Sequence, residues 1–275
     1  MSTRRFIILG CGSSGGVPRL SNTPGGNWGD CDPNEPRNRR TRCSILIEQE
    51  GTDGGLTRVL IDASPDMRQQ LLRHGVGTLD AVVFTHSHAD HCHGLDDLRI
   101  VVFNMAALNK PVRLPVWADP YTRTALEARF DYAFVQLTGS SYPPILDMHT
   151  IDGDVTINGA GGAITLSPFQ VSHGAIDALG FRIGDVAYLP DVADMGPECW
   201  AKLQGLDTWI LDALRRTPHP THIHLERSLE WIARAAPRRG IITNMHTDMD
   251  YRTLLAELPE GVDVAYDGMT LTYEI

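Results

Sequence analysis

The chain has 275 residues, with 24 basic and 34 acidic side chains, so its formal charge is −10. With 42% hydrophobic and 21% charged residues, its composition is that of a folded globular protein and excludes a disordered tail. No apolar run approaches the roughly 18 residues of a membrane span, and the first ten residues lack the apolar stretch of a secretory signal. The acidic balance disfavours a nucleic acid as ligand, because binding a phosphate backbone needs a basic surface.

The chain contains five cysteines, an odd number, and no C-x-x-C pair. A chain of this length can build a core without disulfides, so we expect reduced thiols in a cytoplasmic protein. No linker and no internal repeat divides the sequence, so we predict a single domain over residues 1–275. The sequence leaves the oligomeric state open and is compatible with a homodimer.

Short β-type runs alternate with turns and a few helical segments along the chain. In chain order, we predict strands at Arg5–Leu9, Cys43–Glu48 and Arg58–Asp62, a helix at Pro65–His74, a strand at Leu79–Phe84, and helices at Leu95–Leu108 and Pro120–Phe130. Further on, we predict strands at Ala163–Gln170, Leu179–Ile183, Val186–Leu189 and Thr208–Leu211, a helix at Leu225–Ala236, a strand at Gly240–Thr243, a helix at Tyr251–Leu258 and a strand at Met269–Tyr273. Many short strands without a regular βαβ rhythm indicate an α/β fold of two sheets flanked by helices.

The segment Gly10–Gly15 matches the G-x-G-x-x-G pattern directly after the first predicted strand. A dinucleotide site would need a helix to begin here, because the helix N-terminus receives the pyrophosphate. The following residues, Gly16-Val17-Pro18, cannot continue a helix, so we reject that interpretation. A glycine-rich turn remains, whose amides could line an anion site, and Ser14 within it is a candidate substrate-binding residue.

A cluster of polar residues follows the Leu79–Phe84 strand at once. His86, His88, Asp90 and His91 place four possible metal ligands in six positions. Because residues i and i+2 of an extended segment project to the same side, His86 and His88 can hold one ion. Asp90 and His91 lie beyond a turn and can face a second ion. The spacing therefore predicts a metal-binding loop at the end of a strand.

Three further ligand types emerge where later apolar runs end: His173, Asp191 and His246. Each residue alone would more often be a polar group without a metal. Because all three occur in a chain that also contains the first cluster, we favour their being metal ligands that share one site with it at a rim of the fold.

This order of residues (H-x-H-x-D-H, a lone His, an Asp after a strand and a final His) resembles the metallo-β-lactamase superfamily over essentially the whole chain. The segments Leu9–Pro18, Thr221–Leu225 and Ala265–Met269 resemble its phosphodiesterase branch, in particular the phosphoribosyl 1,2-cyclic phosphate phosphodiesterase (PhnP-like) family. The resemblance implies an α/β fold built as a four-layer αββα sandwich. It also implies a hydrolytic centre with two divalent metal ions, zinc or manganese.

The resemblance also implies roles for single residues. His86, His88 and His173 would hold one ion, Asp90, His91 and His246 would hold the other, and Asp191 would bridge the two. Asp62 matches an aspartate that orients the metal ligands from behind. His222 matches a histidine that contacts the phosphate and assists the leaving oxygen. Asp90 and His222 are thus the candidate catalytic residues, and His222 and Ser14 the candidate substrate-binding residues.

Three features depart from the family pattern. A cysteine-rich loop that holds a structural zinc in the family has only Cys31 here, which puts that zinc in doubt. Counting back from Asp250, the family's last ligand falls at Asn244. We favour His246, brought in by a shift of the loop; otherwise the second metal is weakly held. Residues 121–148 match nothing in the pattern, so their role is open.

These observations predict a metal-dependent phosphodiesterase for a small cyclic nucleotide or sugar phosphodiester. Two ions about 3.5–4 Å apart would lower the pKa of a bridging water, and His222 would protonate the leaving oxygen. The alternatives are a ribonuclease Z-like tRNA-processing nuclease, a thioester or lactone hydrolase, and a non-catalytic carrier of the quinone-cofactor biosynthesis type. The net charge of −10 favours a small substrate over tRNA.

Overall fold

The computed structural model describes residues 2–275. The chain divides into two compact units, and each is described by itself. Unit 1 comprises the N-terminal residues up to Leu9, Ser44–Thr165 and Thr270–Ile275, and unit 2 comprises Gly10–Cys43 and Leu166–Met269. The single domain expected from the sequence stays a prediction.

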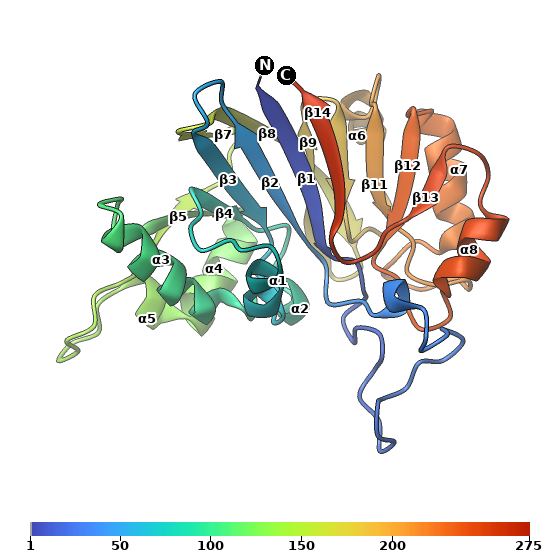
Figure 1. Ribbon diagram of the computed structural model, residues 1–275, viewed down its shortest axis with the longest axis horizontal. Helices are drawn as coiled ribbons and strands as arrows, with labels where there is room; N and C mark the ends of the chain where they lie inside the picture. Colours follow the sequence, from blue (N-terminus) through green and yellow to red (C-terminus); the bar gives the residue numbers. More distant parts are fainter. Residues whose placement is uncertain (1) are drawn as a thin grey trace. The chain divides into compact units, whose positions relative to one another are not determined.

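The first sheet belongs to unit 1 and has seven strands in the order β14-β1-β2-β3-β4-β5-β6 (Figure 1). The strands are β1 (Thr3–Gly10), β2 (Ser44–Glu50), β3 (Leu56–Ile61), β4 (Ala81–Val83), β5 (Leu114–Ala118), β6 (Leu146–Thr150) and β14 (Met269–Glu274). β2 pairs antiparallel with β3, whereas β3, β4, β5 and β6 run parallel to one another. The carboxyl ends of these four parallel strands therefore meet at one edge of the sheet.

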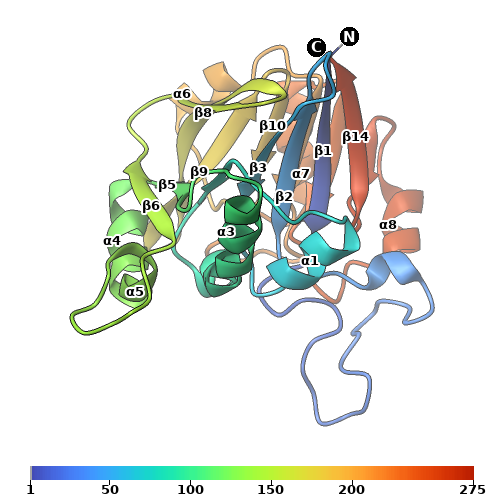
Figure 2. The ribbon, with the colours of Figure 1, turned by 60° about the vertical axis from the view of Figure 1, so that its left-hand side comes forward.

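The helices of unit 1 follow the parallel strands (Figure 2). They are α1 (Met67–Arg73), α2 (Ala89–Cys92), the 3-10 turn η2 (Leu95–Asp97), α3 (Leu98–Ala107), α4 (Pro120–Arg129) and α5 (Asp131–Phe134). Leu71 of α1, Leu98 and Val102 of α3, and Leu126 of α4 are buried in one hydrophobic cluster with Val82 of β4. The metal-binding loop predicted from the sequence begins where β4 ends.

The second sheet also has seven strands, in the order β13-β12-β11-β10-β9-β8-β7. The strands are β7 (Val155–Gly159), β8 (Gly162–His173), β9 (Ile176–Ile183), β10 (Val186–Leu189), β11 (Thr208–Asp212), β12 (Arg239–Thr243) and β13 (Val262–Val264). β7 and the first residues of β8 cluster with unit 1, and the rest lie in unit 2. β8 and β10 both pair antiparallel with β9, and β10 to β13 are parallel, so β8, β10, β11 and β12 end at the same edge.

The helical elements of unit 2 are η1 (Pro36–Asn38), α6 (Pro197–Lys202), α7 (Leu225–Ala235) and α8 (Tyr251–Glu257). Helix α7 buries Ser228, Trp231, Ile232 and Ala235, whose spacing of three and four residues places them on one face. The helix ends at Ala236 in the left-handed conformation, with φ of 51°.

All predicted strands and helices are present, with ends shifted by a few residues. The helix expected over Leu95–Leu108 begins as the 3-10 turn η2 before α3. Two mixed sheets with helices confirm the α/β class. Among residues 2–275, no helix has both the length and the hydrophobicity needed to cross a bilayer. Within the same residues, none of the five cysteines forms a disulfide and all five are buried.

The loop before β2 in unit 2 is fastened to helix α8 through Asp250. One carboxylate oxygen of Asp250 accepts hydrogen bonds from Asp32 N at 3.1 Å and Asn38 Nδ2 at 2.6 Å. The other accepts from Thr253 N and Oγ1, both at 2.9 Å, and caps α8. Burial raises the pKa of Asp250, but these hydrogen bonds outweigh burial and lower the pKa from 3.8 to about 2.

Replacing Asp250 by asparagine is expected to destabilise the protein by about 1–3 kcal/mol at pH 7. The amide NH₂ group would replace one carboxylate oxygen, and the donors that this oxygen now accepts from would lose their acceptor. Since the folded-state pKa is depressed, the carboxylate stabilises the fold above about pH 4, and this contribution is lost as the pH falls toward 2. Urea unfolding of both proteins at pH 7 and pH 3 should therefore show a smaller difference at pH 3. The exposed Glu260→Gln change is the control, and an equal Asp250→Asn effect at both pH values would contradict the assignment.

Candidate metal centre

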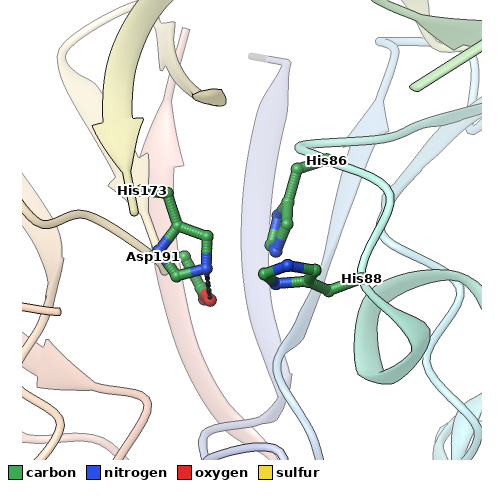
Figure 3. Close-up of side chains that lie close together, drawn as sticks. All are labelled: His86, His88, His173 and Asp191. Atoms are coloured by element: carbon green, nitrogen blue, oxygen red, sulfur yellow. Dashed lines mark ion pairs between the residues drawn. The ribbon is translucent and has the colours of Figure 1, made fainter. Parts of the chain in front are cut away.

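The metal-binding loop of unit 1 leaves the end of β4 and enters the short helix α2. The imidazole rings of His86 and His88 lie 4.6 Å apart between centroids, as their extended spacing predicts, and Figure 3 shows them side by side. The ring of His91, on α2, lies 4.3 Å from that of His86. His91 Nε2 is 3.5 Å from the carboxylate of Asp90. Unit 1 thus gathers three imidazoles and one carboxylate within a single loop.

Asp62 supports this loop from behind, as its sequence position predicts. It follows β3, is fully buried and has a positive φ of 65°, a conformation that aspartate adopts more readily than most residues. Its carboxylate accepts hydrogen bonds from Thr85 N and Oγ1, both at 2.8 Å, and contacts His91 Nδ1 at 2.7 Å. Burial raises the pKa of Asp62, whereas His91 and the hydrogen bonds from Thr85 oppose that shift.

In unit 2, polar side chains emerge at the edge where β8, β10, β11 and β12 end. His173 is the last residue of β8, and Asp191 lies two residues beyond β10. Asp212 is the last residue of β11, and Asn244 directly follows β12. All four are buried, so the sheet brings residues distant in sequence to one place.

His173 and Asp191 form the first pair at this edge. His173 Nδ1 donates a hydrogen bond to the carbonyl oxygen of Thr221 at 2.7 Å, and its Nε2 lies 3.4 Å from Asp191 Oδ2 (Figure 3). Only 2% of His173 and 3% of Asp191 is exposed. Because a carbonyl oxygen can only accept, His173 carries a proton on Nδ1, and its Nε2 is the ring nitrogen that faces the carboxylate.

His222 forms the second pair with a residue that the sequence analysis missed. Its Nδ1 contacts Asp212 Oδ2 at 2.9 Å, and its Nε2 lies 3.9 Å from Asp191 Oδ2. Burial raises the pKa of Asp212 to about 7, although His222 opposes the shift. Asp212 could have been found by the signal that marked Asp191, a carboxylate at the end of an apolar strand.

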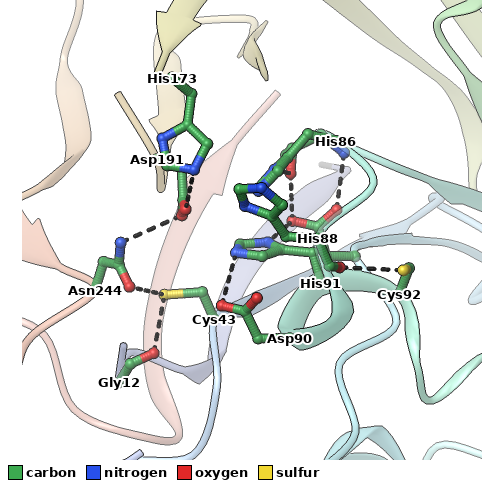
Figure 4. A network of polar contacts seen from close by, with 12 residues as sticks. Gly12, Cys43, His86, His88, Asp90, His91, Cys92, His173, Asp191 and Asn244 are labelled. Carbon is green, nitrogen blue, oxygen red and sulfur yellow. Dashed lines mark hydrogen bonds and ion pairs between the residues drawn. The ribbon is translucent and has the colours of Figure 1, made fainter. Parts of the chain in front are cut away.

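Asn244, rather than His246, lies beside Asp191. Its amide nitrogen donates to Asp191 Oδ1 at 3.2 Å, and its amide oxygen accepts from Cys43 Sγ at 3.7 Å (Figure 4). The same nitrogen also donates to Asp212 Oδ1 at 3.2 Å. The two carboxylates and the thiol together fix the orientation of this amide. His246 instead lies 3.4 Å from Thr247 Oγ1 and 3.6 Å from Asp248 Oδ1 through its Nδ1. The metal role of His246 stays a prediction.

The glycine-rich turn of unit 2 is closed by backbone pairing and not by a helix. Gly12 forms bridges with Arg42 and Met245, and a Cβ atom at Gly12 would lie 2.9 Å from the carbonyl oxygen of Arg40. No helix begins in the described segment between β1 and η1, which agrees with the rejection of a dinucleotide site. Ser14 is exposed on this turn, and its contact with substrate stays a prediction.

The donor chemistry of both units fits divalent metal ions. A metal-binding histidine usually gives one ring N–H to an acceptor and keeps the other nitrogen for the ion. His91 and His173 both do this, with Asp62 and the Thr221 carbonyl as the acceptors of their Nδ1 protons. Each unit adds a carboxylate, Asp90 or Asp191, within 3.5 Å of the remaining Nε2. Imidazole and carboxylate are ligands that both zinc and manganese accept.

A model of the beta-lactamase superfamily domain matches residues 57–245, more than half of the chain. The chain therefore belongs to the metallo-β-lactamase superfamily and has the metallo-β-lactamase fold. The sequence-based prediction of a hydrolase of this fold is confirmed, and divalent metals are the cofactors that such a fold implies.

The chain is similar to a protein of known structure, described as a new diphosphatase from the PhnP family, with 33% sequence identity and a TM-score of 0.85. The match covers 99% of this chain and 98% of that chain. This confirms the predicted resemblance to the PhnP-like branch. The octanoyltransferase of Porphyromonas gingivalis (strain W83) is 33% identical over 96% of this chain, which spans about half (51%) of that relative's length. Zn²⁺-bound PqqB from Methylobacterium extorquens, at 21% identity with 97% and 99% coverage and a TM-score of 0.72, shares the fold.

Proposed function

We propose that this protein is a metal-dependent phosphodiesterase that opens a small cyclic phosphodiester of a nucleotide or sugar. The observation that carries the proposal is the His222–Asp212 pair of unit 2, with His222 Nε2 3.9 Å from Asp191. A buried carboxylate behind an imidazole is the arrangement of a proton donor. The PhnP-family diphosphatase that resembles this chain supports phosphorus chemistry.

The proposal assigns the ligands as the sequence suggested. His86, His88, Asp90 and His91 of unit 1, with His173, Asp191 and His246 of unit 2, would hold two divalent ions, zinc or manganese. When bound, such ions offset the charge of phosphoryl oxygens and make water acidic near neutral pH. Asp62 keeps the Nδ1 proton of His91 in place, and the Thr221 carbonyl does the same for His173.

His222 and Asp212 perform the proton transfer. Asp212 accepts a hydrogen bond from Nδ1–H of His222 and stabilises the imidazolium form, so that Nε2 can donate its proton to the departing alkoxide. The alkoxide released when the cyclic phosphodiester opens is a poor leaving group, and protonation by His222 allows it to depart.

A second candidate is hydrolysis of a diphosphate, which the similarity to a diphosphatase of the PhnP family favours. The net charge of −10 favours a small anion over a nucleic acid in either case. The deciding experiment offers metal-loaded protein a ribose cyclic phosphate, 2′,3′-cyclic nucleotides, bis(p-nitrophenyl) phosphate and a nucleoside diphosphate, with zinc and with manganese. Opening of the cyclic esters supports the proposal, whereas turnover of the diphosphate alone assigns the second candidate.

Other results would replace the proposal. Hydrolysis of a thioester or lactone but of no phosphodiester would assign that activity, and cleavage of a tRNA precursor would assign the ribonuclease Z-like one. A metal-loaded protein inert on the whole panel would indicate a carrier. A homodimer and a cytoplasmic location complete the proposal as predictions.

A further inference from the structure

The corner between α4 and α5 of unit 1, whose role was open from the sequence, contacts the metal-binding loop and the residues that follow it. Helix α4 is held firmly by the first sheet: Asp119 caps its N-terminus, Arg123 Nη1 donates to Thr150 Oγ1 of β6 at 2.8 Å, and Leu126 is fully buried. Arg113, the residue before β5, donates through Nη2 to the carbonyl of Phe134 at 2.9 Å and so holds the end of α5. Figure 2 shows both helices beside β6. The corner between them is thus a rigid base.

Arg129, the last residue of α4, contacts the loop at its ligands. Its Nη1 donates a hydrogen bond to the carbonyl oxygen of Ser87, the residue between His86 and His88, and lies 3.8 Å from Cys92 Sγ. Cys92 Sγ donates in turn to the carbonyl of His88 at 3.1 Å. Figure 4 shows Cys92 pointing away from the imidazole rings, so Arg129 acts on the rear of the loop.

Two neighbours of Arg129 extend this contact beyond the ligands. The ring of Phe130 meets that of His93 edge to face, with centroids 5.5 Å apart. The hydroxyl of Tyr132 donates to Asp96 Oδ1 at 2.9 Å. Contacts from three side chains of the corner therefore reach Ser87, Cys92, His93 and Asp96, a stretch that begins between the ligands and ends at η2.

We propose that Arg129, Phe130 and Tyr132 form a ligand clamp, which holds His86, His88 and His91 ready for a metal ion before it binds. This inference rests on the proposed metal centre. A guanidinium on the Ser87 carbonyl holds the peptide that joins Ser87 to His88, and so the backbone between the two ligands His86 and His88, whether or not a metal ion is bound. Arg129 is a positioning residue, because it touches the loop and not the substrate.

The test compares Arg129→Met, Arg129→Lys and Tyr132→Phe with wild-type protein, using Arg68→Met, at an exposed position of α1 in the same unit, as the control. In metal-free protein, hydrogen exchange of the 86–92 amides should become at least about tenfold faster in Arg129→Met, and be partly restored in Arg129→Lys. Zinc affinity, measured by competition with a chelator, should fall roughly 10–100-fold in Arg129→Met. The visible spectrum of the Co²⁺-loaded variant should change shape, which reports the geometry of the histidine ligands.

The clamp is refuted if Arg129→Met exchanges at the wild-type rate over residues 86–92, or if Arg68→Met accelerates that exchange equally. Wild-type zinc affinity and an unchanged Co²⁺ spectrum in Arg129→Met would also overturn it. Failure of wild-type protein to bind any metal would refute the proposed function, and the exchange measurement would still decide whether the clamp exists. Tyr132→Phe removes one hydrogen bond, so it provides a milder variant should Arg129→Met not fold.

Discussion

Replacing His222 by alanine is expected to lower kcat on a ribose cyclic phosphate by about 10²- to 10⁴-fold, the contribution of a positioned general acid. The effect on bis(p-nitrophenyl) phosphate should be less than about tenfold, because p-nitrophenolate leaves without protonation. Metal content should stay that of wild-type protein. Steady-state kinetics on both substrates with elemental analysis of each preparation check this.

The contrast between the two leaving groups separates a proton donor from a structural histidine. His224→Ala is the matched control, since His224 lies two residues away and its Nε2 faces Glu226 at 3.8 Å. Equal losses of kcat on both substrates would show that His222 is not the general acid. A His222→Ala protein that has lost its metal would make His222 a ligand instead. Asp212→Asn should reproduce the leaving-group contrast to a smaller degree, because His222 would lose the partner of its Nδ1 proton.

Asp62→Asn should weaken zinc binding by roughly 10–100-fold, the second large effect expected. An amide keeps the volume of the carboxylate and tolerates its positive φ of 65°, but it cannot accept from Thr85 N, Thr85 Oγ1 and His91 Nδ1 at once. Part of the buried hydrogen bonding would be lost, and His91 would no longer be held with its proton on Nδ1. Chelator competition on purified protein measures the affinity.

Asp80→Asn is the control for this carboxylate-to-amide change. Asp80 accepts a hydrogen bond from Arg58 N at 2.8 Å, next to the other end of β4, and lies in the same unit. We expect Asp80→Asn to lower stability and to leave the zinc affinity unchanged. Equal zinc affinities of Asp62→Asn and wild-type protein would show that Asp62 does not support the metal ligands.

The strands predicted correctly from the sequence share a run of apolar residues bounded by turns. This signal depends only on neighbouring residues and can be read without the tertiary structure. The missed strands lack that signal: β5 contains Pro115, β6 is Leu-Asp-Met-His-Thr, and β13 has three residues. β6, β7 and β13 each lie at an edge of a sheet, where one neighbour suffices and the burial pattern is weak. These segments form strands because each of them pairs with a neighbouring strand of its sheet.

Local spacing by itself determined the H-x-H-x-D-H loop, the strand before it and the ligand types at later strand ends, because each of these depends on a few adjacent residues. Only the tertiary structure decided that Asp212 pairs with His222, that Asn244 lies beside Asp191, and that Arg129 holds the carbonyl of Ser87. These partners are 10, 53 and 42 residues apart. Such contacts arise where parallel strands end together or a helix packs back onto a loop, and no pattern of neighbouring residues encodes them.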